Sequence, residues 1–140
     1  MLNHSITYQL TVKASTENLS EVRDFVATYA RQEGFSSQQI TDTRLAVDEA
    51  FTNIIKHAYQ NDESKPVNLE LQFDSEKLCI IISDQGKAFD VSKYTFPDVK
   101  TQIKNKQRGG MGVYLIHNLM DEVTYRNQKE KNLIIMCKHR

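Results

Sequence analysis

The chain has 140 residues, of which 39% are hydrophobic and 26% charged, and its 18 basic and 18 acidic side chains cancel. This length and composition are typical of one compact domain, predicted over residues 1–140. Zero net charge argues against a general nucleic-acid or membrane surface, and no apolar run approaches the roughly 20 residues that span a bilayer. With no basic and apolar leader visible, we expect a cytoplasmic protein that binds neither nucleic acid nor membrane.

Hydrophobic periodicity predicts the first elements in chain order. Apolar and polar residues alternate over 6–12, which predicts a half-buried strand, and a helical repeat follows over 19–29. Ser36 and Gln39 match a capping box, so a second helix is predicted to begin here and to run to about Tyr59.

The second half of the chain is predicted to hold four strands and a short helix. Residues 67–73 alternate, whereas 78–83 are apolar on both faces and predict a central strand. Residues 91–108 lack periodicity, and such long irregular segments are usually functional or mobile. The last predicted elements are a helix at about 110–120 and strands at 123–126 and 133–137. This order predicts an α+β two-layer sandwich with a mixed, mostly antiparallel sheet and helices on one face.

The cysteines and histidines give no sign of a metal site. Cys79 and Cys137 each lie in an apolar, strand-like run, and their spacing matches no zinc pattern. In a chain without a visible leader, we expect both to be reduced thiols that pack in the core. The four histidines are scattered, and no pair has metal-ligand spacing.

The second predicted helix carries a polar row on one edge. Glu49, Asn53 and His57 are spaced by four residues, so their side chains stack along the helix. The small side chains of Ala46 and Ala50 lie beside them and leave room for a ligand against the helix. The alternative is a solvated edge whose i,i+4 contacts contribute only a few tenths of a kcal/mol.

An acidic residue and a glycine follow the most apolar strand. Asp84 stands at its end, and Gly86 comes two residues later. A carboxylate held there can accept a hydrogen bond from an exocyclic amine such as that of adenine, and a glycine lets a flat ring approach the backbone. The alternative is an ordinary turn, in which Asp and Gly are common.

A glycine cluster precedes the short helix at 110–120. The chain has only five glycines, and three of them fall in this cluster. Free N–H groups and the partial positive charge at a helix N-terminus favour phosphate binding, although a glycine cluster can also be a flexible hinge. The segment consists of Arg108, Gly109, Gly110, Met111, Gly112 and Val113.

Together and in this order, the three segments resemble the N, G1 and G2 boxes of the GHKL ATPases, the relatives of gyrase, Hsp90, histidine kinases and MutL. Residues 45–59 and 108–116 look most like the anti-sigma factor serine kinases, and the resemblance spans essentially the whole chain. It implies the Bergerat ATP-binding fold, with ATP or ADP and Mg²⁺ bound beside a flexible lid at about 91–109.

The resemblance also implies roles for individual residues. Glu49 corresponds to the general base, and Asn53 to the amide that binds Mg²⁺ and nucleotide. Asp84 corresponds to the carboxylate that reads adenine, with Gly86 as its companion. The nucleotide-binding turn corresponds to Arg108, Gly109, Gly110, Met111, Gly112 and Val113.

The implied function is phosphorylation of a STAS-type anti-sigma factor antagonist in a partner-switching module, by a homodimer that also binds a sigma factor. The chain departs from the family pattern before its last strand, where Glu130-Lys131-Asn132 replaces a Gly-Thr pair. Asn132 is the candidate replacement for the missing hydroxyl. Two alternatives remain: an ATP- or ADP-binding partner switch without catalysis, and a stand-alone histidine-kinase-like ATPase domain.

Overall fold

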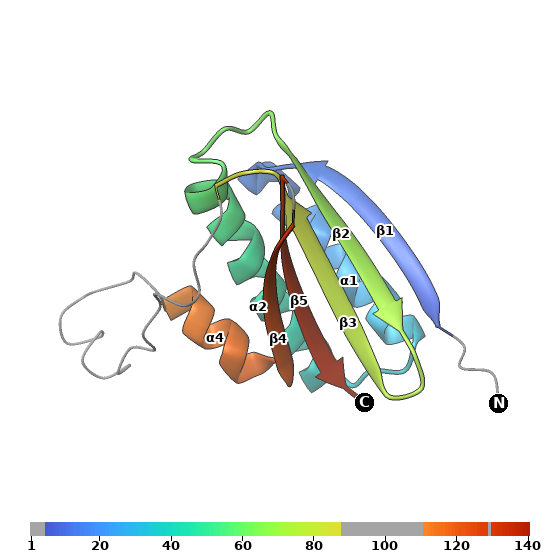
Figure 1. The fold of residues 1–140 in the computed structure, drawn as a ribbon. Coiled ribbons are helices and arrows are strands. Elements are labelled where there is room, and N and C mark those ends of the chain that lie inside the picture. Colours follow the sequence, from blue (N-terminus) through green and yellow to red (C-terminus); the bar gives the residue numbers. More distant parts are fainter. Residues whose placement is uncertain (1–4, 88–110, 129) are drawn as a thin grey trace, which may run out of the picture.

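The computed structural model describes residues 5–87, 111–128 and 130–140, with the backbone alone for 111–113. Figure 1 shows that this part of the chain forms a five-stranded sheet with helices on one face. The lid predicted at about 91–109 lies outside the described residues. The elements are β1 (Ile6–Lys13), the 3₁₀ turn η1 (Thr16–Asn18), α1 (Leu19–Gln32), α2 (Ser37–Asn53), the π-helical turn η2 (Ile54–Ala58), β2 (Pro66–Phe73), β3 (Lys77–Asp84), α4 (Met111–Leu119), β4 (Glu122–Gln128) and β5 (Lys131–His139).

The predicted capping box begins α2. The Gln39 N–H donates to Ser36 Oγ at 3.1 Å, and the Ser36 N–H donates to Gln39 Oε1 at 2.8 Å. These two bonds satisfy backbone donors that a helix N-terminus otherwise leaves unpaired. The Gln39 Nε2 also donates to the His139 carbonyl at 2.9 Å, so the start of α2 is tied to the end of β5.

The strand order is β1-β2-β3-β5-β4, and every neighbouring pair is antiparallel. The prediction that 78–83 form a central strand is confirmed. The mixed character predicted for the sheet is absent from the described strands. The reason is that β5 lies between β3 and β4 and is antiparallel to both (Figure 1). The strands β3 and β4 run in the same direction, but they are not neighbours.

The core lies between the sheet and the helices, as predicted for a two-layer α+β fold. Alternate residues of β2 and β3 are fully buried, because alternate side chains of a strand point to the same face. They meet the apolar sides of α1 and α2 in one hydrophobic cluster. Among the described helices, none is long and apolar enough to cross a membrane.

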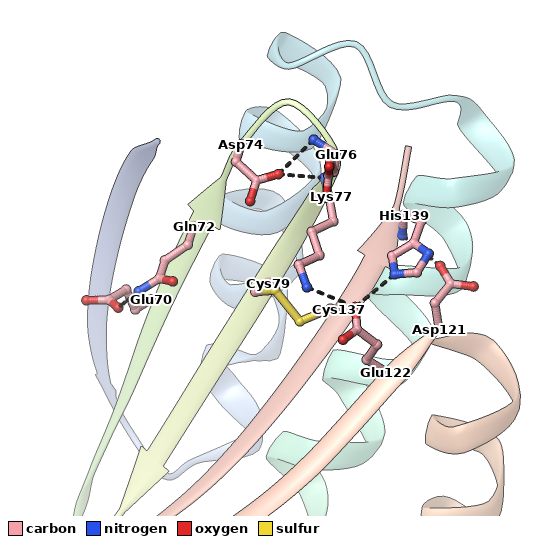
Figure 2. The surroundings of a disulfide bond; sticks show 10 residues. All are labelled: Glu70, Gln72, Asp74, Glu76, Lys77, Cys79, Asp121, Glu122, Cys137 and His139. Atoms are coloured by element: carbon pink, nitrogen blue, oxygen red, sulfur yellow. Dashed lines mark hydrogen bonds and ion pairs between the residues drawn. A yellow bond between two sulfur atoms is a disulfide. The ribbon is translucent and has the colours of Figure 1, made fainter. Parts of the chain in front are cut away.

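The prediction of two reduced cysteines is wrong. Cys79 and Cys137 lie directly opposite each other on β3 and β5, with their Cα atoms 4.1 Å apart, and form a disulfide. Figure 2 shows the bridge on the sheet, beside the ion pairs that Glu122 makes with Lys77 and His139. Strand register brings the two sulfur atoms together, although 58 positions separate them in sequence.

Candidate functional site

Helix α2 presents the first two predicted site residues. Glu49 and Asn53 lie one turn apart near its C-terminal end, and both are half-buried. Four residues along a helix correspond to a rise of about 6 Å and to nearly the same face. Neither side chain makes a hydrogen bond or ion pair with a residue that the structure describes. Both polar groups are therefore available to a ligand on this side of α2.

The alanines beside this row have a structural role. Ala46 is fully buried and Ala50 is 3% exposed, and both belong to the hydrophobic core. The solvated edge considered as an alternative is therefore wrong at these two positions. Their small side chains pack in the core and are not part of an open surface beside Glu49 and Asn53.

The helix does not continue regularly to Tyr59 as predicted. After Asn53 it widens into η2, where the Tyr59 N–H donates to the Ile54 carbonyl at 2.9 Å. Such π-helical turns are rare and frequently occur at functional sites. His57 lies on η2 and is exposed, so the row of residues spaced by four effectively ends at Asn53. No role for His57 follows from this position.

Asp84 ends β3 in a buried position, with 7% of its surface exposed. Its Oδ1 accepts hydrogen bonds from the Gly86 N–H and from Asn132 Nδ2, both at 2.9 Å. The Asn132 Nδ2 donates in addition to the Gly86 carbonyl at 2.9 Å. Asp84, Gly86 and Asn132 therefore form one hydrogen-bonded group, which the pairing of β3 with β5 brings together.

Gly86 is a glycine because the backbone of the helix end passes beside it. A Cβ at this position would lie 2.6 Å from the carbonyl carbon of Ala58 and even closer to its oxygen. The next residue, Lys87, donates its N–H to the same Ala58 carbonyl at 2.8 Å. The sequence predicted that Gly86 allows a close approach to the backbone. In the structure, the group that approaches Gly86 closely is the Ala58 carbonyl of the η2 turn.

Tyr59 supports this loop and was missed in the sequence. Its hydroxyl accepts the Gln85 N–H at 2.8 Å and donates to the Pro66 carbonyl at 2.6 Å. Burial raises the pKa of the Tyr59 phenol, which keeps the hydroxyl protonated as the second bond requires. Nothing in the local sequence signals this role, because its partners come from β2 and from the end of β3.

Part of the predicted glycine turn falls outside the described residues. This applies to Arg108, Gly109 and Gly110, whereas the backbone of Met111, Gly112 and Val113 forms the first turn of α4. The predicted helix at about 110–120 is confirmed by α4. The phosphate-binding role of all six residues remains a prediction.

The described residues offer no cluster of metal ligands, and a small cavity borders Asp84. They hold no group of three or more His, Cys, Asp or Glu side chains that could bind a metal ion. A cavity of about 220 Å³ lies at the Asp84 end of the sheet and is lined by Thr11, Pro66, Asn68, Ser83, Asp84, Gln85 and Lys131. This volume is below the roughly 300–1,000 Å³ usual for ligand pockets.

A protein-family model, the histidine kinase-like ATPase domain, matches residues 12–138 of the chain. The chain belongs to this family. Within it, the chain is 35% identical to the serine-protein kinase RsbW of Halalkalibacterium halodurans, over 94% of this chain and 80% of that protein. The RsbW proteins of Staphylococcus aureus and Bacillus subtilis are 36% and 31% identical, over 83% and 91% of this chain and 76% and 82% of those proteins. The ATPase family member described here is thus an RsbW-like protein, whose relatives are serine-protein kinases.

Solved structures share the fold of this histidine kinase-like ATPase. The RsbU and RsbW domains of Rv1364c from Mycobacterium tuberculosis match with a TM-score of 0.69 and 14% identity, over 95% of this chain and 31% of that chain. The SiaB-SiaC complex from Pseudomonas aeruginosa matches with a TM-score of 0.63 and 12% identity, over 95% of this chain and 89% of that chain. The predicted Bergerat-type fold is confirmed by these neighbours.

Proposed function

We propose that this chain is a Mg²⁺-dependent protein kinase that transfers the γ-phosphoryl group of ATP to a serine or threonine of a STAS-type anti-sigma factor antagonist. Its membership in a family of RsbW-like serine-protein kinases supports the reaction type. The observation that carries the proposal is the pair Glu49 and Asn53, one turn apart on α2 and without partners among the described residues.

The nucleotide is bound at both ends in this proposal. Asp84 accepts the exocyclic amine of adenine, and Gly86 lies beside the base. The phosphates lie at the N-terminus of α4, against the backbone of Gly109, Gly110, Met111, Gly112 and Val113, with Arg108 adding positive charge. The partial positive charge at the beginning of a nine-residue helix supports this placement.

The donor set also fits Mg²⁺. This ion usually takes one or two oxygen ligands from the protein and the others from phosphates and water, and the Asn53 side-chain oxygen is such a ligand. When bound, Mg²⁺ neutralises charge that develops on the phosphates. The fit rests on the chemistry of Asn53 and on its position beside Glu49.

Glu49 is the general base in this mechanism. It accepts the proton of the substrate hydroxyl while that oxygen forms a bond to the γ-phosphorus of ATP. The bond from the γ-phosphorus to the bridging oxygen breaks, and ADP leaves. Because Glu49 and Asn53 lie on one rigid helix, the distance between the base and the amide that would hold Mg²⁺ is constant.

The proposed setting is a cytoplasmic partner switch. In it the chain forms a homodimer and binds either the STAS-domain antagonist or a sigma factor. The structure of a SiaB-SiaC complex shows that a protein of this fold assembles with a partner. A non-catalytic ATP- or ADP-binding switch is the second candidate, favoured by Asn132 in place of the expected threonine.

The test is phosphoryl transfer by Glu49→Gln. With radiolabelled ATP, Mg²⁺ and a cognate STAS protein, wild type is expected to label a serine or threonine of that protein. Loss of the general base should lower the transfer rate by about 10²- to 10⁴-fold, with nucleotide affinity retained.

Asp48→Asn is the matched control. Asp48 is the neighbouring acid on α2, but it pairs with Arg23 Nε at 2.8 Å. Its variant should transfer phosphate at nearly the wild-type rate, since a surface ion pair contributes less than about 1 kcal/mol. Transfer at the wild-type rate by Glu49→Gln would refute the assignment of the base. ATP binding by wild type without any transfer would favour the non-catalytic switch.

A further inference from the structure

The two oxygens of the Asp84 carboxylate have different surroundings. Oδ1 accepts two hydrogen bonds, from the Gly86 N–H and from Asn132 Nδ2. Oδ2 accepts none from the residues that the structure describes, although Asp84 is only 7% exposed. Oδ2 is not one of the fully buried side-chain atoms that lack a partner in the described part of the chain, so it remains accessible and can accept a hydrogen bond from a ligand.

Asn132 holds the carboxylate in this orientation. Both N–H bonds of its amide are used, one to Asp84 Oδ1 and the other to the Gly86 carbonyl, each at 2.9 Å. The amide is itself held by the backbone, because Asn132 pairs with Asp84 in the β3–β5 register. A side-chain amide has two donors, whereas the hydroxyl expected from the family pattern has only one.

We infer that Asn132 is a positioning residue that sets the base selectivity of the nucleotide site. By occupying Oδ1, it leaves Oδ2 as the one free acceptor that Asp84 presents to the base. Such an acceptor bonds the 6-amino group of adenine and repels the 6-carbonyl oxygen of hypoxanthine or guanine. The inference rests on the proposed nucleotide site and adds the determinant of its selectivity.

The consequence is a strong preference for 6-aminopurine nucleotides. A site built to bond a particular N–H rejects analogues that lack it, because its own polar group is then left unpaired. Without Asn132, the carboxylate can turn about its side-chain bonds and take donors from water. Selectivity between bases should therefore depend on Asn132, while phosphate binding at the other end of the nucleotide should not.

The experiment compares the affinities of ATP and ITP, which differ at position 6 of the purine. Calorimetric titrations in Mg²⁺ would use wild type, Asn132→Ala and Asn132→Thr. We expect Asn132→Ala to lose about 10- to 100-fold in ATP affinity, the usual effect of removing a hydrogen bond to a charged group, with little change for ITP. Asn132→Thr should fall between the two, since its hydroxyl supplies one donor.

Asn127→Ala is the matched control, because Asn127 lies opposite Asn132 on β4 and is exposed. It should keep the wild-type ratio of ATP to ITP affinity. An unchanged ratio in Asn132→Ala, or in Asn132→Thr if the alanine variant does not fold, would overturn the inference. If wild type bound neither nucleotide, or Asp84→Asn kept full ATP affinity, the proposed nucleotide site itself would fail.

Discussion

At Gly86 a single missing Cβ determines how the loop after β3 meets the helix that carries Glu49. The Ala58 carbonyl occupies the position that any larger side chain would need, and Lys87 donates to the same carbonyl at 2.8 Å. The backbone of Ala58 is held by η2 and cannot yield as a flexible side chain would. The relative position of α2 and Asp84 therefore depends on a glycine here.

Gly86→Ala is expected to lower the free energy of unfolding by about 1–3 kcal/mol, the usual cost of inserting a methyl group into a packed site. It should also weaken nucleotide binding, because the loop must move away from α2. Urea denaturation and calorimetry measure the two effects. Gly34→Ala is the comparison: at φ +87° it is strained, but its Cβ meets only the tip of Arg140 at 4.0 Å. That variant should lose stability and keep nucleotide affinity; equal affinity in both variants would contradict the argument.

At the scale of elements, the Cys79–Cys137 bridge joins the two strands at the centre of the sheet. These strands also place Asp84 opposite Asn132, at the far end of the same register. Disulfides are rare in the cytoplasm, where we propose that this protein acts. The effect of a reductant on stability therefore tests whether the bridge forms and how much the fold depends on it.

Reduction of the bridge should destabilise the protein by roughly 2–4 kcal/mol, because the cross-link removes chain entropy from the unfolded state. Urea denaturation of wild type with and without dithiothreitol would measure the loss. The double variant Cys79→Ala/Cys137→Ala is the control and should not respond to the reductant. A wild-type midpoint that is the same in both conditions would mean that the two thiols are free.

At the scale of the whole molecule, helices and sheet are linked by buried contacts. Lys138, on β5, donates to Asp42 on α2 at 3.2 Å and to the Leu119 carbonyl at the end of α4. The α4 helix also packs against α2, and its Ile116 has no exposed surface. The element that begins with the predicted phosphate turn is thus anchored on the helix that carries Glu49.

Ile116→Ala is expected to cost about 2–5 kcal/mol, since it removes buried methyl groups and leaves a cavity. Leu115→Ala is the matched control on the same helix, because Leu115 is 36% exposed. It should change the free energy of unfolding by less than about 0.5 kcal/mol. Urea denaturation compares the two variants, and equal losses would mean that α4 does not pack on the core through Ile116.

Local sequence patterns were sufficient to predict the elements and the part of the site that lies on one helix. Strands and helices that bury one face show hydrophobic periods of about 2 and 3.6 residues. Their positions could therefore be predicted along the chain, beginning with the strand at residues 6–12. The capping box at Ser36 and the spacing of Glu49 and Asn53 are local in the same sense. They follow from helix geometry and need no distant partner.

The features that depend on strand order and register could be seen only in the folded chain. Because β5 pairs with β3, the described sheet is wholly antiparallel. The same pairing brings Cys137 to Cys79 and lets the Asn132 amide donate a hydrogen bond to Asp84. The π-helical turn and the role of Tyr59 likewise arise from contacts with distant segments. Such contacts link residues tens of positions apart, and local periodicity carries no information about which segments become neighbours.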